Sequence, residues 1–269
     1  MKYKVLVFDI DGTLTNSKKE ITPATKAAIE RASRAGCTIA IASGRPYPGT
    51  VRYATELNFA GNDGYVLALN GGLIVRCRDE KVMNSELLSP EYYEEIIRIA
   101  AENNVNIMTY DGDVVVSETI DDRYIDLEMR INGIKGKKVD NLLEYLDYSV
   151  PKFIMTGDGD YLAEVEKRVK KQLGDRMDVY RSEAFFLEIL PKGVDKATAI
   201  EKLLLMLGCT REELICFGDG YNDMTMLEYA GMGVAMGNAK EEVKAVADYI
   251  TSGNDEDGIV EVIDKFVLD

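Results

Sequence analysis

The sequence predicts an α/β protein whose parallel-sheet core is interrupted by a second domain of α+β type. Two observations carry this prediction. In the first eighty or so residues, apolar strands alternate with helices across short turns, which is typical of a parallel sheet with helical crossovers. About a hundred residues of a different texture follow, with hairpins and helices mixed, before the first texture returns. We therefore expect a discontinuous core of residues 1–83 and 187–269 around an inserted domain of residues 84–186.

Length and charge narrow the classes of function. The chain has 269 residues, 46% of them hydrophobic, so it is long enough for one large or two smaller domains. Its net charge of −15 argues against a nucleic-acid or anionic-membrane partner, because no basic stripe is present to displace counterions from phosphates. We interpret this charge as a means of solubility.

Histidine is absent from the sequence, which removes Ser-His-Asp and Cys-His catalysis and histidine metal sites. Acid–base chemistry must then use carboxylates, Lys, Tyr or Cys. The four cysteines have no C-x-x-C spacing and indicate reduced thiols in a cytoplasmic protein. We expect no signal peptide, because Asp9 cuts short the apolar run at the N-terminus. We also expect no membrane span, because no apolar run in the sequence approaches the length needed to cross a bilayer. The cysteines are Cys37, Cys77, Cys209 and Cys216.

The first part of the core opens with Val5–Phe8, four apolar residues that predict a strand buried on both faces. Thr22 and Pro23 have the residue types preferred at the N-cap and first position of a helix, which Gly36 ends. The following elements are expected as a strand over 37–42, a helix around 50–57 and a strand over 65–69.

The expected inserted domain begins with a helix over 90–104 and a hairpin turning at Asp111-Gly112. Further on we expect a weak helix, a loop containing Gly133 and Gly136, and a short helix. The last elements are a strand over 150–156, a helix over 160–173, and strands over 177–181 and 185–190 around a Ser182-Glu183 turn.

The core resumes with a helix over 195–207 that Gly208 closes, and Thr210-x-x-Glu213 is a capping-box pattern. A fourth apolar strand over 214–217 follows. We expect a helix over 224–229, a strand over 233–236, a helix over 240–247, a strand at 249–250 and a terminal helix. The insertion is thus expected between the third and fourth strands of the core.

Polar side chains follow four of these strands: Asp9 and Asp11, Ser43, Asn70, and Asp219, Asn222 and Asp223. Each cluster alone is compatible with ordinary turn chemistry. The carboxyl ends of parallel strands lie along one edge, however, so at least four carboxylates would crowd there and favour a cation. Without histidine or a thiolate cluster, Mg²⁺ suits this site better than zinc or copper.

The segment Asp9-Ile10-Asp11-Gly12-Thr13 resembles the first motif of the haloacid dehalogenase superfamily. Ser43, Lys196 and Gly218-Asp219-Gly220-x-Asn222-Asp223 follow in the order of the other motifs. The insertion between the serine and lysine motifs, with Ser43-Gly44-Arg45 and Asn70-Gly71, resembles the large α/β cap of the Cof-type branch. The resemblance covers essentially the whole chain and implies a Rossmann-like core with this cap.

The resemblance also implies roles. Asp9 would be the nucleophile that forms an aspartyl-phosphate, and Asp11 the acid and base. The ligands of Mg²⁺ would be Asp9, the backbone carbonyl of Asp11 and Asp219, with Asp223 binding directly or through a water. Ser43 and Lys196 would bind phosphoryl oxygens, and Gly12 would let backbone N–H groups approach them. The other expected substrate-binding residues are Gly44, Arg45, Asn70 and Asn222.

Two of these assignments keep an alternative. Lys192 could take the place of Lys196, which we prefer because it matches the family spacing and would open a helix. Arg45 could contact substrate or pair with a surface acid.

We expect a Mg²⁺-dependent phosphatase of small phosphorylated metabolites, most readily sugar phosphates, with the insertion as a lid. One alternative is a phosphomutase of the same superfamily, which would need cap cations such as Arg123, Arg130 and Lys152 for a second phosphate. Another is a phosphometabolite-binding protein that has lost catalysis. No protein partner is evident, and we expect a monomer or weak homodimer.

Overall fold

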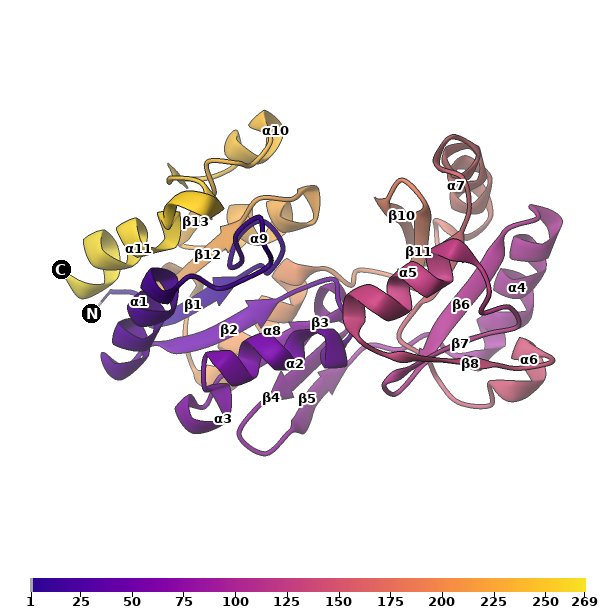
Figure 1. Ribbon diagram of the computed structural model, residues 1–269, viewed down its shortest axis with the longest axis horizontal. Coiled ribbons are helices and arrows are strands. Elements are labelled where there is room, and N and C mark those ends of the chain that lie inside the picture. The colour runs from indigo at the N-terminus through magenta and orange to yellow at the C-terminus, as the bar shows by residue number, and fades with distance from the viewer. Residues whose placement is uncertain (1) are drawn as a thin grey trace. The chain divides into compact units, whose positions relative to one another are not determined.

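The computed structural model describes residues 2–269 and divides them into two compact units. Unit 1 comprises the residues up to Arg45, Thr50–Asn84 and Asp195–Asp269, and unit 2 comprises Pro46–Gly49 and Ser85–Val194. Figure 1 traces both units by residue number. The mixed α/β fold with a parallel-sheet core that the sequence predicts is confirmed.

Unit 1 is built on an eight-stranded sheet. Strand β1 (Val5–Phe8) lies at its centre and pairs in parallel with β2 (Thr38–Ala42) and β12 (Leu214–Gly218). Its four apolar residues suit this position, which is buried on both faces. Parallel pairing continues to β3 (Tyr65–Ala68) on one side and to β13 (Met232–Ala235) and β14 (Tyr249–Ile250) on the other. The strand order is β14 (Tyr249–Ile250), β13 (Met232–Ala235), β12 (Leu214–Gly218), β1 (Val5–Phe8), β2 (Thr38–Ala42), β3 (Tyr65–Ala68), β4 (Leu73–Arg76) and β5 (Lys81–Ser85).

Helices cover both faces of this sheet. Helices α8 and α9 pack on the face formed by Val5, Val7 and their neighbours, and Figure 1 shows α1 and α2 on the opposite face. Helix α1 begins after the N-cap Thr22 with Pro23 at its first position, as the sequence predicts. The helices are α1 (Pro23–Arg34), α2 (Tyr47–Glu56), α3 (Phe59–Asn62), α8 (Lys196–Leu207), α9 (Met224–Tyr229), α10 (Glu241–Lys244) and α11 (Gly258–Ile263), with short turns at Leu69–Gly71, Arg211–Glu213, Tyr221–Asp223, Asn254–Glu256 and Asp264–Leu268.

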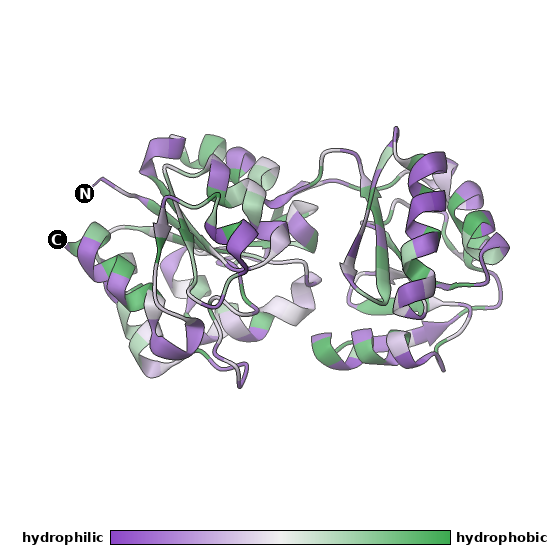
Figure 2. Ribbon diagram, turned by 90° about the horizontal axis from the view of Figure 1, so that it is seen from above, coloured by the Kyte–Doolittle hydropathy of each residue, from purple (hydrophilic) through white to green (hydrophobic). Residues whose placement is uncertain are grey.

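Unit 2 has a six-stranded sheet with its own hydrophobic core. Figure 2 shows many hydrophobic residues in the strands, while the helices carry hydrophobic and hydrophilic residues in alternation along their length. Pairing is antiparallel except between β7 and β8. The order is β10 (Met177–Glu183), β11 (Phe186–Pro191), β9 (Phe153–Thr156), β6 (Asn106–Asp111), β7 (Val114–Ser117) and β8 (Lys135–Lys138).

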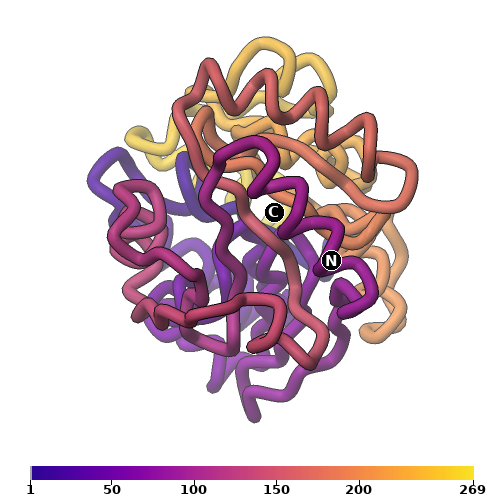
Figure 3. Tube along the Cα trace, turned by 90° about the vertical axis from the view of Figure 1, so that its right-hand side faces the viewer, coloured from indigo at the N-terminus to yellow at the C-terminus, as the bar shows by residue number. Residues whose placement is uncertain are grey.

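Two amphipathic helices, α4 (Tyr93–Glu102) and α7 (Gly159–Leu173), cover one face of this sheet and lie in front of its strands in Figure 3. They bury Ile96 and Val165 against Phe153 and Leu187. The remaining helices are α5 (Arg123–Asn132), α6 (Leu142–Tyr145) and a short turn at Pro90–Tyr92.

Several predicted elements differ from the observed ones. Strands β4 and β5 had no prediction, so the insertion follows β5 and not the third strand of the core. The segment around Gly136, expected as a loop, forms β8 through backbone pairing with β7. The expected domain boundary at residues 186–187 falls inside β11, which pairs with β9 and β10, and unit 2 extends to Val194. The helix expected over 240–247 is limited to α10.

Candidate active site

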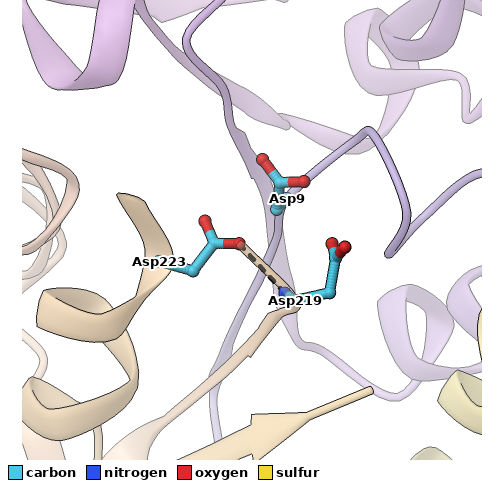
Figure 4. Close-up of side chains that lie close together, drawn as sticks. All are labelled: Asp9, Asp219 and Asp223. Atoms are coloured by element: carbon cyan, nitrogen blue, oxygen red, sulfur yellow. Dashed lines mark hydrogen bonds between the residues drawn. The ribbon is translucent and has the colours of Figure 1, made fainter. Parts of the chain in front are cut away.

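Three aspartates meet at the carboxyl ends of two neighbouring strands. Asp9 follows β1 and Asp219 follows β12, and the parallel register Phe8↔Phe217 places these strand ends side by side. Asp223 comes from the turn before α9, and one of its oxygens accepts the backbone N–H of Asp219 at 3.0 Å. Figure 4 shows the three carboxylates converging from these elements. Each offers one oxygen to a group whose members lie within 4.8 Å of one another.

Lys196, the first residue of α8, is fully buried and faces this group. Its Nζ donates at 2.5 Å to Oδ1 of Asp9 and at 2.5 Å to Oδ1 of Asp223. Burial lowers the pKa of Lys196, but the two carboxylates outweigh burial and hold the pKa above its usual range. Lys192, the alternative in the sequence, instead pairs with Asp178 at 3.1 Å in unit 2.

The carboxylates repel one another in a buried place. Burial raises the pKa of Asp9 above its ordinary range, and the charge of Asp223 adds to that rise while Lys196 opposes it. Burial likewise raises the pKa of Asp219 to about 6. Carboxylates with raised pKa values bind protons in competition with a cation, and a bound cation would relieve their repulsion.

The residues present fit a hard divalent cation. The donor set consists of oxygens alone, which Mg²⁺ prefers. Gly12 has φ of +88°, and a Cβ at this position would collide with the Asp219 carboxylate, so the glycine leaves room for that carboxylate beside the loop. Asp219 is oriented by Thr13, whose Oγ1 donates to its Oδ1 at 2.7 Å.

The side chain of Asp11 lies outside this three-carboxylate group and binds two cations. Arg45 donates from Nε to Oδ2 at 2.7 Å and from Nη2 to Oδ1 at 2.9 Å, and Lys19 donates to Oδ1 at 2.9 Å. Burial would raise the pKa of Asp11, but Arg45 and Lys19 together lower it to about 2. The acid that Arg45 contacts is thus Asp11.

The other expected substrate-binding residues lie at the ends of β2 and β3. Ser43 is buried after β2, and its Oγ accepts the backbone N–H of Arg45 at 3.2 Å. Asn70, buried with φ of +55°, accepts the side-chain amide of Asn222 at 3.3 Å. A Cβ on Gly44 would lie 3.2 Å from Asn70 Oδ1, so this loop packs closely on Asn70.

Three residues that contact the site were not predicted from the sequence. Thr13 ends the motif that begins at Asp9, but its contact with Asp219 spans 206 residues, so only the fold reveals this contact. Lys19 belongs to no motif in the sequence, and its contact with Asp11 is seen only in the fold, where this exposed residue has φ of 62°. Asn238 follows β13, and the rule of strand ends that selected Asn70 could have selected it.

Comparison with known proteins identifies the family. Residues 6–263 match the model of the haloacid dehalogenase-like hydrolases. The chain is 30% identical to YxeH of Bacillus subtilis (strain 168) over 269 residues, which covers 99% of each protein. Within residues 2–269, no helix combines the length and the apolar composition needed to cross a bilayer.

Solved structures agree with this assignment. A haloacid dehalogenase-like hydrolase from Bacteroides thetaiotaomicron superposes with a TM-score of 0.92 at 42% identity, covering 98% of this chain and 99% of that one. The subclass IIB sugar phosphatase BT4131 gives a TM-score of 0.80 at 27% identity, covering 98% of each chain. With residues 6–263 matched and these relatives aligned along their whole length, the chain belongs to the haloacid dehalogenase-like hydrolases and is a phosphatase of that family.

Proposed function

We propose that this protein is a Mg²⁺-dependent phosphatase that hydrolyses small phosphorylated metabolites, sugar phosphates among them, through an aspartyl-phosphate on Asp9. One observation supports this above all. A fully buried lysine contacts two of three convergent carboxylates, at 2.5 Å each, on the edge of a parallel sheet where ligands bind. A buried charged cluster of this kind is costly to maintain for stability alone, which favours a catalytic role.

Asp9 is the proposed nucleophile. Its Oδ attacks phosphorus, the P–O bond to the alcohol breaks, and the alcohol oxygen takes up a proton as it leaves. A water molecule then attacks the phosphorus of the aspartyl-phosphate, releasing inorganic phosphate and restoring the Asp9 carboxylate. Lys196 already contacts Asp9 and is placed to neutralise charge on the transferred phosphoryl group.

We assign the proton transfers to Asp11. As a carboxylate it can take the proton of the attacking water, and its low pKa in the present arrangement keeps it ionised for that second step. A carboxylate with so low a pKa is a weak base, so release from Arg45 and Lys19 also raises its basicity toward the water. To protonate the leaving alcohol in the first step, Asp11 must exchange its bonds with Arg45 and Lys19. A phosphate dianion competes for the same two cations, so substrate binding favours that exchange.

The metal ligands we propose are Asp9, the backbone carbonyl of Asp11, Asp219 and Asp223. When bound there, Mg²⁺ supplies positive charge that stabilises the negative charge of the phosphoryl group. Ser43 is proposed to bind a phosphoryl oxygen, and Gly12 to let the loop backbone approach it. Gly44, Arg45, Asn70 and Asn222 complete the proposed substrate contacts at the ends of β2, β3 and β12.

Two further observations bear on the substrate. BT4131, which aligns with 98% of this chain, is named a sugar phosphatase. The residues proposed for chemistry all belong to unit 1, so we assign the choice among phosphate esters to unit 2, which we interpret as the cap. A hydrolysis screen over phosphorylated metabolites tests this assignment, and exchanging unit 2 with that of a relative is expected to change the preferred substrate.

The nucleophile is tested with Asp9→Asn. This isosteric change removes the attacking carboxylate, so hydrolysis of p-nitrophenyl phosphate with Mg²⁺ is expected to fall by about a thousandfold or more. Asp63→Asn serves as the control, since Asp63 is an exposed acid of unit 1 paired with Arg78 on the surface. Turnover near the wild-type rate in Asp9→Asn, with the control unchanged, would exclude the proposed mechanism.

A second assay, with a sugar phosphate as substrate, separates phosphatase activity from phosphomutase activity. With a hexose 1-phosphate as substrate, a phosphatase releases inorganic phosphate, whereas a phosphomutase accumulates the 6-phosphate isomer. We expect inorganic phosphate. Accumulation of the isomer would replace the proposal with the mutase alternative.

A further inference from the structure

Two asparagines near the C-terminus hold the loop that follows β1. Asn238 Nδ2 donates to the backbone carbonyl of Gly12 at 2.9 Å. Asn254 Nδ2 donates to the backbone carbonyl of Thr15 at 2.8 Å. A third contact runs from the Ser17 N–H to Asp255 Oδ1 at 2.8 Å. The loop is therefore fastened at three points by residues more than 220 positions away in the sequence.

The two asparagines are also joined to each other. Asn238 Oδ1 accepts the backbone N–H of Asn254 at 3.0 Å, so the oxygen of its amide is engaged on one side while its nitrogen faces Gly12. The segments that carry them are paired through their backbones, with Gly237 N–H donating to Ser252 O at 3.1 Å. The frame that presents the two amides is thus built into unit 1.

The loop held in this way borders the three-carboxylate group. Gly12 packs directly on the Asp219 carboxylate, and Asn238 Nδ2 lies 3.5 Å from Asp219 Oδ2. Thr13 of the same loop binds the other oxygen of Asp219. A shift of the loop would move a donor to Asp219 and, with it, the backbone carbonyl of Asp11 that is proposed as a metal ligand.

We propose that Asn238 and Asn254 are positioning residues, which fix the loop from Gly12 to Ser17 and thereby orient Asp219 and the Asp11 carbonyl for a divalent cation. The identity of the cation rests on the function proposed above, whereas the restraint on the loop does not. Residues that orient metal ligands from behind change metal affinity by about 10- to 100-fold when they are removed. Neither asparagine touches the proposed nucleophile.

Two substitutions separate the contacts. Asn238→Ala removes the donor to Gly12, the acceptor for Asn254 and the 3.5 Å contact with Asp219. Asn254→Ala keeps its backbone N–H, and with it the bond to Asn238, but loses the donor to Thr15. The matched control is Asn62→Ala, because Asn62 is an exposed asparagine of unit 1 that donates at 3.4 Å to the carbonyl of Leu57.

Two measurements on substrate-free protein test whether the asparagines position the loop, and a kinetic measurement with substrate follows. Amide hydrogen exchange in the absence of metal is expected to become about tenfold faster or more at residues 12–17 in both variants, with Ser17 N–H as a reporter. Titration calorimetry with Mg²⁺ alone is expected to give an affinity about tenfold weaker for Asn238→Ala. At saturating Mg²⁺, the KM for p-nitrophenyl phosphate is expected to stay at the wild-type value. Asn62→Ala should match the wild type in each measurement.

Wild-type exchange at residues 12–17 in both variants would overturn the proposal. A loss of protection spread evenly over unit 1 would do the same, because it would mark a general structural role. If the wild-type protein binds no Mg²⁺, the proposed metal dependence fails, and hydrogen exchange still decides whether the two asparagines hold the loop.

Discussion

At the scale of single residues, the protonation state of Asp11 depends on its neighbours more than on its own chemistry. Two cations donate three hydrogen bonds to its carboxylate. Arg45 makes two of these bonds with the planar geometry that matches a carboxylate, and it is the more deeply buried partner. The sequence alone did not decide whether Arg45 contacts substrate or pairs with a surface acid. Asp11 and Arg45 are far apart in the chain, so no local pattern reveals their contact.

Replacing Arg45 with Ala is expected to raise the pKa of Asp11 from about 2, because burial would then be opposed by Lys19 alone. A folded-state pKa below the unfolded value of about 4 stabilises the protein above pH 4, and this contribution is lost as the pH falls from 4 to 2. The variant should lose less stability over that window. Carbon-13 NMR titration of the Asp11 carboxyl measures the shift.

Arg34→Ala is the control for this titration, because Arg34 is an exposed arginine of unit 1 paired with Glu30 within α1. An Asp11 pKa that stays near 2 in Arg45→Ala would show that Lys19 suffices to hold the carboxylate ionised.

At the scale of elements, the strands with longer apolar runs were predicted, whereas β4, β5 and β8 were missed, although residues 73–75 of β4 are apolar. Strands β1 and β12 consist of buried apolar residues, and β2 does so after the partly buried Thr38, so their sequence identifies them. Strand β8 has the sequence Lys-Gly-Lys-Lys and forms at the edge of the unit 2 sheet through backbone pairing with β7. Lysines are common on such edges because they discourage pairing with other chains, and they give no hydrophobic signal.

Tyr93 joins two segments of unit 2 through one buried hydroxyl. It accepts the Val150 N–H at 2.7 Å and lies 2.9 Å from the carbonyl oxygens of Leu88 and Tyr148, to which it can donate. Its ring packs edge-on against Phe153 at 5.1 Å. The hydroxyl therefore links the start of α4 to the segment that leads into β9, where Leu88 and Val150 form a bridge.

Tyr93→Phe is expected to destabilise the protein by about 1–3 kcal/mol, because the buried Val150 N–H keeps only its longer bond of 3.3 Å to the Leu88 carbonyl and the bonds of the hydroxyl to the carbonyls are lost. Urea unfolding near pH 7 measures the loss. Burial raises the pKa of Tyr93 to about 12, so the wild-type advantage is complete below pH 10 and disappears as the pH rises from 10 to 12.

Tyr161→Phe provides the comparison, since the half-exposed hydroxyl of Tyr161 donates to the carbonyl of Asn103 and water can replace it. Equal losses in the two variants would mean that burial of the Tyr93 hydroxyl contributes nothing.

At the scale of the whole molecule, the two units have separate hydrophobic cores. The three-carboxylate group belongs to unit 1 alone, so a cation bound there stabilises that unit directly. Any ligand that binds only the folded state raises the free energy of unfolding by mass action. At a ligand concentration of 100 times its Kd the increase is about 2.7 kcal/mol.

Mg²⁺ is expected to raise the unfolding temperature of the wild-type protein in scanning calorimetry at pH 7.5. Because burial raises the pKa of Asp219 to about 6, protons compete with the cation below that pH, and the increase should be smaller at pH 5.5. Asp219→Asn should remove most of the effect. An equal increase in this variant would place the bound cation elsewhere.

Local periodicity and short motifs predict the α/β fold class, the family and the strand ends at which polar residues gather. The individual contacts among those residues follow from the tertiary structure. It brought Asp9, Asp219, Asp223 and Lys196 together, turned Asp11 toward Arg45 and Lys19, and brought Asn238 to Gly12. Pairing across about two hundred residues depends on sheet register and side-chain packing, which no local pattern specifies.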